Sequence, residues 1–224
     1  MATSNKPTCL IVLSAHHKGV SLQSFVHAYT VAMTPFNVFL ATPQGGHPIY
    51  VGGDENSQRW IKDFKQQMVA VPEKLENVDA TQFVALMIPN CPGAVFDLWN
   101  NDSMTNILEH FVSEKKSICA VGYGVCALFS GLAGNQKKTW CFKNYSMTAP
   151  SVVEAVQRDD FPVLPVVPAD YIRENHGVYS ASQDDKVHVV IHDNLITGQN
   201  DQSNLTAIQN LVLLCSQRQN KPTR

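Results

Sequence analysis

Charged residues are scarce in this chain, and those present nearly cancel. Asp, Glu, Lys and Arg together make up 16% of the 224 residues, and the formal net charge at pH 7 is −2. A surface of this composition has no strong basic field to attract nucleic acid or an anionic membrane. The composition therefore predicts that the protein makes no direct contact with nucleic acid.

Long apolar runs are missing as well. Residues 1–7 contain no apolar segment of the kind that begins a secretory signal, and no run approaches the roughly 18 apolar residues that span a membrane. We expect no membrane insertion and a cytoplasmic protein. In that location the sequons at Asn144 and Asn204 would not be glycosylated.

The cysteines lack the spacing of metal or redox sites. None of the six forms a C-x-x-C pair or a zinc-ligand pattern, and their positions are 9, 91, 119, 126, 141 and 215. Several, including Cys119 and Cys215, stand within apolar runs, which predicts reduced thiols packed in a core. With 44% hydrophobic residues, the chain can bury such a core without disulfides or a metal.

The histidines do not indicate a metal centre either. His16 and His17 follow the first expected strand, and adjacent residues on extended backbone point in opposite directions, so they should not both ligate one metal. We expect both to be solvated loop histidines. His188 and His192 would have zinc-like spacing on a helix, but the residues around them are mostly β-branched, which favours a strand. On a strand they would lie roughly 13 Å apart. We therefore expect no metal and no cofactor.

Continuous apolar runs alternate with segments of helical periodicity. This alternation is typical of an α/β fold with a doubly wound, mostly parallel sheet flanked by helices. We expect one domain over residues 1–224, with flexible tails at 1–7 and 217–224. The expected strands are 8–13, 37–41, 83–88, 117–121 and a hairpin of 187–191 with 195–197, and the expected helices are 21–33, 104–114 and 205–215. Residues 150–180, which contain four prolines, permit no prediction.

In such a sheet, functional groups gather at the carboxyl ends of the strands. The segments expected there are 14–19, 42–46, 89–93 and 122–124. The last is the most informative, because the residues around it predict a buried strand, a tight turn and the start of a helix. This arrangement is a nucleophile elbow, which holds a reactive Ser or Cys on strained backbone. The turn residue here is Gly122, which has no atom to attack a carbonyl.

No residue near the turn is an obvious replacement nucleophile. The chain contains no G-x-S-x-G sequence, and Tyr123 offers no base for a cysteine–histidine pair. Cys126 lies one helical turn beyond Gly122 and should point into the core. Cys91, beside a Pro-Gly in the loop at 89–93, is the better candidate for a residual reactive thiol. The sequence thus indicates a catalytic fold that lacks its catalytic group.

Five motifs stand in the order found in one known superfamily. They are GVSLQS at 19–24, ATPQGG at 41–46, PNCPG at 89–93, AVGYGV at 120–125 and LITGQN at 195–200. Through them, nearly the whole chain resembles the PfpI-like, class I glutamine amidotransferase-like superfamily, which includes peptidase-like, chaperone, deglycase and glyoxalase members. The resemblance implies the flavodoxin-like α/β fold of that superfamily.

The departures from the superfamily pattern bear on activity. By the resemblance, the nucleophilic cysteine is Gly122 here, and the histidine that follows it is Tyr123. The acidic pair and part of the glycine-rich active-site loop are also replaced. The degenerate positions are Gln23, Ser24, Asn90, Cys91, Gly122 and Tyr123. Glu154 lies near an acidic position of the superfamily, but a single acid activates nothing, so we predict a pseudoenzyme with no catalytic residue.

The glycine elbow is similar to that of a non-catalytic vertebrate branch of the superfamily. That resemblance implies a homo-oligomer, a tetramer, and membership of FERRY, a multi-subunit Rab-GTPase effector complex that links early endosomes to messenger RNA transport. The partners it implies are the other FERRY subunits. Two alternatives stay open. One is a thiol-dependent enzyme or redox sensor that uses Cys91 or Cys126, and the other is a module that binds a metabolite in the retained crevice.

Overall fold

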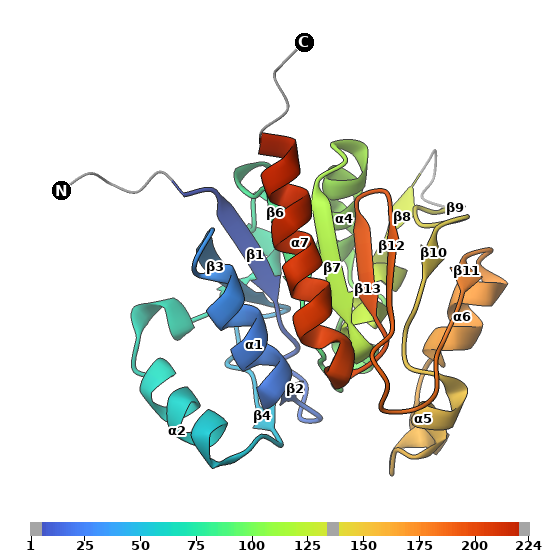
Figure 1. Ribbon diagram of the computed structural model, residues 1–224, viewed down its shortest axis with the longest axis horizontal. Helices are drawn as coiled ribbons and strands as arrows, with labels where there is room; N and C mark the ends of the chain where they lie inside the picture. Colours follow the sequence, from blue (N-terminus) through green and yellow to red (C-terminus); the bar gives the residue numbers. More distant parts are fainter. Residues whose placement is uncertain (1–5, 134–138, 220–224) are drawn as a thin grey trace.

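Seven strands form the central sheet of the computed structural model, which describes residues 6–133 and 139–219 (Figure 1). In spatial order they are β12 (Val189–His192), β13 (Leu195–Gly198), β7 (Ser117–Val121), β6 (Ala85–Ile88), β1 (Thr8–Val12), β3 (Asn37–Thr42) and β5 (Glu73–Lys74). Neighbouring strands are parallel, except in the antiparallel hairpin of β12 and β13. The predicted doubly wound, mostly parallel sheet is confirmed.

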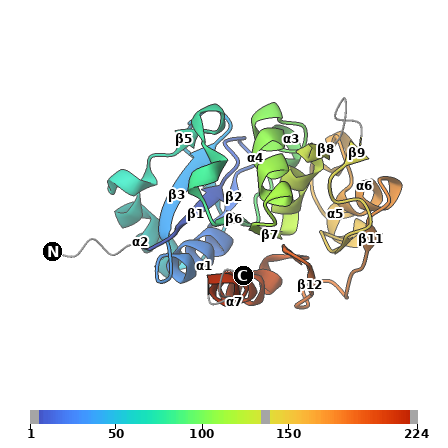
Figure 2. The ribbon, with the colours of Figure 1, turned by 90° about the horizontal axis from the view of Figure 1, so that it is seen from above.

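Helices cover both faces of this sheet (Figure 2). On one face lie α1 (Leu22–Ala32) and α7 (Asn204–Gln219), which also contact each other. On the other face lie α3 (Ala94–Asp97), α4 (Asp102–Ser113) and, packed against both, the 3-10 helix η4 (Gly122–Ser130). Strands β1, β6 and β7 are almost entirely buried because both of their faces are covered, and this explains their continuous apolar sequences.

Smaller elements surround the sheet. Helix α2 (Glu55–Phe64) packs against α1 through a cluster of aromatic rings. The short strand pairs are β2 (Val20–Ser21) with β4 (Tyr50–Val51), β8 (Leu132–Ala133) with β9 (Thr139–Trp140), and β10 (Ser146–Met147) with β11 (Val178–Tyr179). The further 3-10 turns are η1 (Met68–Ala70), η2 (Leu75–Asn77), η3 (Ala80–Gln82), η5 (Phe161–Val163) and η6 (Asp201–Ser203). Within the described ranges, none of the helices combines the length and apolar character that a membrane span needs.

Residues 150–180, for which the sequence permits no prediction, form a small lobe beside the β12 edge of the sheet (Figure 1). The lobe contains α5 (Val152–Val156), η5, α6 (Pro168–Glu174) and β11. Just before it, the backbone N–H of Thr148 donates to the hydroxyl of Thr197 on β13 at 2.9 Å. This bond helps to hold the start of the lobe against the strands that carry the site.

One strand boundary needs correction, and the helix expected after the elbow takes a 3-10 form. It is η4, which runs from Gly122 to Ser130, and all nine of its residues are buried. Strand β12 begins at Val189, two residues later than expected. Of the two expected flexible tails, residues 1–5 and 220–224 lie outside the described residues. Helix α7 continues to Gln219, and the carbonyl of Pro7 accepts the N–H of Asn37 at 2.9 Å.

Candidate functional site

Gly122 makes the turn at the end of β7. Its φ is +55°, in the left-handed region that favours glycine. A Cβ added at this position would lie 2.5 Å from Cγ of Asn90 and closer still to Oδ1 of the same side chain. Both the backbone and the surrounding space therefore select glycine. The predicted tight turn is confirmed.

Asn90 is held firmly in the place where a side chain at position 122 would lie. Its Oδ1 accepts the backbone N–H of Tyr123 at 3.0 Å. Its own N–H donates to Oγ of Ser24 at 2.8 Å, and its carbonyl accepts the N–H of Ser21 at 2.8 Å. These three bonds fix the loop after β6 against the elbow and the start of α1.

The two positions that resemblance assigns to an acidic pair have separate environments. Ser24 is fully buried, and its hydroxyl donates to Oδ1 of Asn204 at 2.9 Å. Nδ2 of Asn204 returns a hydrogen bond to the carbonyl of Ser24 at 3.0 Å. The side chain of Gln23 is exposed. Ser24 thus joins α1 to α7, while Gln23 takes no part in the site.

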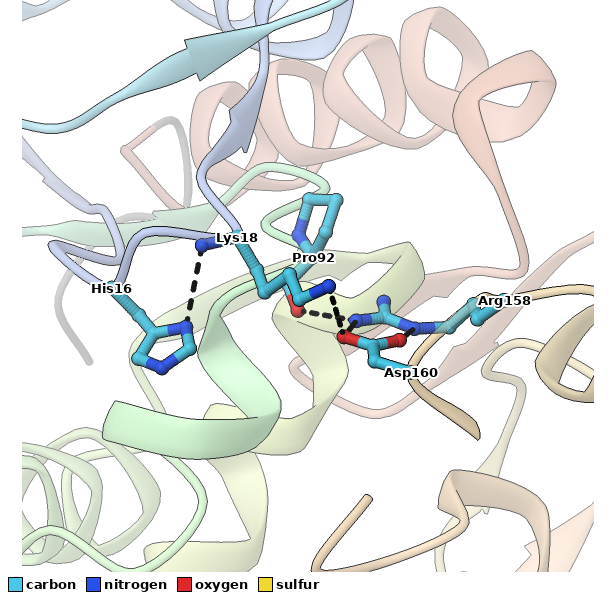
Figure 3. Close-up of polar contacts among 5 residues, drawn as sticks. All are labelled: His16, Lys18, Pro92, Arg158 and Asp160. Carbon is cyan, nitrogen blue, oxygen red and sulfur yellow. Dashed lines mark hydrogen bonds and ion pairs between the residues drawn. The ribbon is translucent and has the colours of Figure 1, made fainter. Parts of the chain in front are cut away.

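Arg158 contacts Tyr123 of the elbow, and it also bonds Asp160 and Pro92 in the surrounding loops (Figure 3 draws the latter contacts). Its guanidinium lies over the ring of Tyr123, 4.1 Å from the centroid, and donates to both carboxylate oxygens of Asp160 at 2.7 and 2.9 Å. It also donates to the carbonyl of Pro92 at 3.2 Å, and the Lys18 ammonium lies 3.3 Å from the same carboxylate. These partners, with Arg158 foremost, lower the pKa of Asp160 to about 2.

This cation–carboxylate cluster was missed by reasoning from sequence. Arg158 and Asp160 fall within the proline-containing segment that permits no prediction, and Lys18 lies in a loop more than a hundred positions away. The nearest available signal was the pairing of an Arg and an Asp two residues apart. That signal is too common to indicate a site.

A small polar pocket, of about 140 Å³, opens beside Gly122. In its wall, the side-chain amides of Gln199 and Asn200 donate to the carboxylate of Glu154, each at 2.9 Å. The carboxylate also accepts the backbone N–H of Ser151 at 2.7 Å, in the capping box that begins α5. Because three donors engage the Glu154 carboxylate, its role is structural: it joins the start of α5 to Gln199 and Asn200. The pocket can hydrogen-bond a small polar molecule, but no thiol lies in its wall.

The candidate thiols have the environment of packing cysteines. Cys91 and Cys126 have no exposed surface, and burial raises the pKa of both thiols. Reactive cysteines need access and a lowered pKa, and these residues have neither. Cys141, on the turn after β9, is less buried, and burial raises its pKa to about 12. All six cysteines are free.

The rings of His16 and His17 lie 4.1 Å apart between centroids, so the expectation that these two side chains point in opposite directions is wrong. His16 is half-buried rather than solvated, because its ring stacks on Phe96 at 4.5 Å between centroids. Nε2 of His188 lies 3.0 Å from the hydroxyl of Ser180, and Nδ1 of His192 accepts the N–H of Ser146 at 3.1 Å. Across the described part of the chain, no group of three or more ligating side chains could hold a metal ion.

Comparison with known proteins gives the family. A Xenopus laevis protein named glutamine amidotransferase-like class 1 domain-containing protein 1 is 48% identical over 213 residues, which cover 95% of this chain and 92% of that protein. The Homo sapiens protein of the same name is 46% identical over 214 residues, or 96% of each chain. The chain belongs to this family. A search of protein-family models found no match.

Solved structures show the same fold. The Rapid Encystment Protein 24 KDa of Francisella tularensis superposes with a TM-score of 0.83 at 18% identity, covering 93% of this chain and 99% of that one. A ThiJ/PfpI domain protein from Brachyspira murdochii gives a TM-score of 0.66 at 13% identity, covering 95% and 98%. At these identities the likeness concerns the fold alone. The predicted PfpI-like, class I glutamine amidotransferase-like fold is confirmed.

Proposed function

We propose that this family member is not an enzyme and acts as a structural subunit of a multi-protein assembly. The observation that carries the proposal is the contact between Asn90 and Gly122. An elbow enzyme needs a nucleophile at the turn, and it uses the N–H of the following residue to stabilise the oxyanion. Here the turn residue has no side chain, and the N–H of Tyr123 is already bound by Asn90.

The thiol-dependent alternative has little support. A cysteine nucleophile would have to reach a substrate at the carboxyl edge of the sheet, yet Cys91 and Cys126 are fully buried. The metabolite-binding alternative has one specific observation in its favour. Oδ1 of Asp201, a residue of the pocket wall beside Gly122, is buried and has no hydrogen-bond partner among the described residues. We keep this as the second candidate function.

The identity of the assembly is proposed from the resemblance stated above. We propose that the protein is a homotetrameric, cytoplasmic subunit of the FERRY complex and reaches early endosomes through its partners. An assembly role suits a fold that retains its scaffold without a catalytic group, since repeated copies offer several docking sites and raise avidity. Light scattering tests the oligomer, and a monomer at micromolar concentration would contradict it.

A turnover assay tests the lack of catalysis. The full chain is incubated with methylglyoxal, a glycated amino acid and an unstructured peptide, and we expect no product above the buffer control. Turnover that survives repurification from a second host and disappears in Glu154→Gln would overturn the proposal. Turnover that Glu154→Gln leaves unchanged would point to a contaminating enzyme, so the purified variant serves as the control.

A further inference from the structure

A second cavity opens at the amino-terminal edge of the sheet. Its volume is about 250 Å³. Its walls are formed by Val84, Glu114, Lys116, Ser117, Cys215 and Arg218. Ser117 begins β7 and Gly122 follows the end of that strand, so the cavity lies on the order of 15 Å from the elbow. It is a separate site, and the function proposed above does not involve it.

The wall of this cavity contains an unsatisfied hydroxyl. Ser117 is 1% exposed; its Oγ lies near the thiol of Cys215, a weak partner, and makes no hydrogen bond of full geometry with the described residues. Buried hydroxyls are normally paired, so an unpaired one in a cavity wall indicates a group that a ligand could satisfy. The thiol of Cys215 stands in the same wall and is 6% exposed. It makes the neighbouring surface apolar and polarisable.

The charges around the cavity favour an anion. Lys116 and Glu114 have opposite charges and lie near each other, and the Lys116 ammonium also donates to the carbonyls of Ala80 and Thr81 at 3.0 and 3.2 Å. Lys116 is therefore already engaged. Arg218, in the last turn of α7, forms no ion pair with any carboxylate of the described residues. It is the cation available to a ligand.

We propose that this cavity binds a small molecule with one carboxylate and a short apolar body. Arg218 and the Ser117 hydroxyl would bind the carboxylate, and Val84 and Cys215 would contact the apolar body. The volume is below the ~300 Å³ at which pockets for drug-sized ligands begin, so the body is limited to a short chain or a single ring. The Arg218 guanidinium would repel an amine, and a neutral alcohol would lose the charge-assisted contact with Arg218.

Calorimetry with sodium hexanoate tests the site on the full chain. We expect saturable binding of hexanoate, weaker binding of hexanol and none of hexylamine. Arg218→Gln should weaken hexanoate binding about tenfold, because it removes a charge-assisted hydrogen bond. Ser117→Ala should weaken it roughly threefold to fivefold. Arg173→Gln, which changes an exposed arginine on α6, is the matched control and should leave the affinity unchanged.

Thiol labelling locates the binding independently. Cys215 lies in the cavity wall and is 6% exposed, and burial raises the pKa of its thiol, so methyl methanethiosulfonate should modify it more slowly than Cys141 over a long incubation. Hexanoate should slow the modification of Cys215 several-fold further while leaving the rate at Cys141 unchanged. Peptide mass spectrometry measures both rates in one sample. The proposal is overturned if hexanoate gives no saturable binding, if it fails to protect Cys215, or if Arg173→Gln weakens binding as much as Arg218→Gln.

Discussion

The side-chain amide of Asn90 occupies the space into which a side chain at position 122 would extend. An added Cβ on Gly122 would lie 2.5 Å from Cγ of Asn90, and Oδ1 of that amide accepts the N–H of Tyr123 at 3.0 Å. Asn90 thus fills the space of a side chain at position 122 and accepts the N–H that an elbow enzyme would use in catalysis. Placing a cysteine at position 122 alone would therefore not create an active site.

Gly122→Ala should lower the free energy of unfolding by about 1–3 kcal/mol, from backbone strain and overlap with Asn90. Urea denaturation measures the change. Gly52→Ala is the matched control, because Gly52 also has a positive φ, +70°, but an added Cβ there meets nothing within 4 Å. We expect the smaller loss at Gly52. Equal losses, or an unchanged midpoint for Gly122→Ala, would show that Asn90 does not restrict the turn.

Combining Gly122→Ala with Asn90→Gly separates the two contributions at the elbow. Removing the Asn90 side chain should relieve the overlap, so the double variant should lose less stability than the sum of the two single variants. The strain from positive φ would remain. Strict additivity in the denaturation data would contradict a direct steric conflict between the two positions.

Asp160 should make stability depend on pH in the acid range. Its pKa in the folded protein is lowered to about 2, chiefly by hydrogen bonds from Arg158, whereas the ordinary value is 3.8. Its contribution is therefore complete above about pH 4 and is lost as the pH falls toward 2. The stability difference between the wild type and Asp160→Asn, measured by denaturation, should shrink over that interval. Asp159→Asn, which removes the exposed neighbouring carboxylate outside this cluster, is the matched control variant.

Thiol mapping under native conditions should leave Cys91 and Cys126 unmodified. Both are fully buried, and burial raises the pKa of each thiol, whereas Cys141 retains some exposure. We expect a small maleimide, followed by peptide mass spectrometry, to label Cys141 before either of the others. Rapid labelling of Cys91 would instead revive the thiol-dependent alternative.

The central strands could be predicted because a strand buried on both faces needs a continuous apolar sequence. Strands β1, β6 and β7 are continuous apolar runs, and Gly122 marks a turn that few other residues tolerate. The wall of the site could not be predicted, because Arg158 reaches Tyr123 and Pro92 only after distant segments have packed together. Local periodicity carries no information about such contacts.

The role of Asn90 could not be predicted from the sequence either. The family resemblance marks position 90 only as a degenerate loop residue. Its function depends on a side-chain oxygen placed against the backbone of Gly122 and Tyr123, 32 and 33 residues further along the chain. The resemblance indicates which positions depart from the family pattern, whereas the geometry shows that the Asn90 side chain lies where a Cβ at position 122 would extend.

The most direct test of a structural role is to capture partners from cells with variants of the pocket beside the elbow. Tyr123→Phe and Glu154→Gln change the polar atoms of that pocket, and light scattering would confirm that each variant keeps the wild-type size. The account predicts that mass spectrometry finds the same partners, in the same amounts, for the wild type and both variants. A folded variant of unchanged size that loses its partners would contradict it and would favour recognition of a metabolite in the pocket.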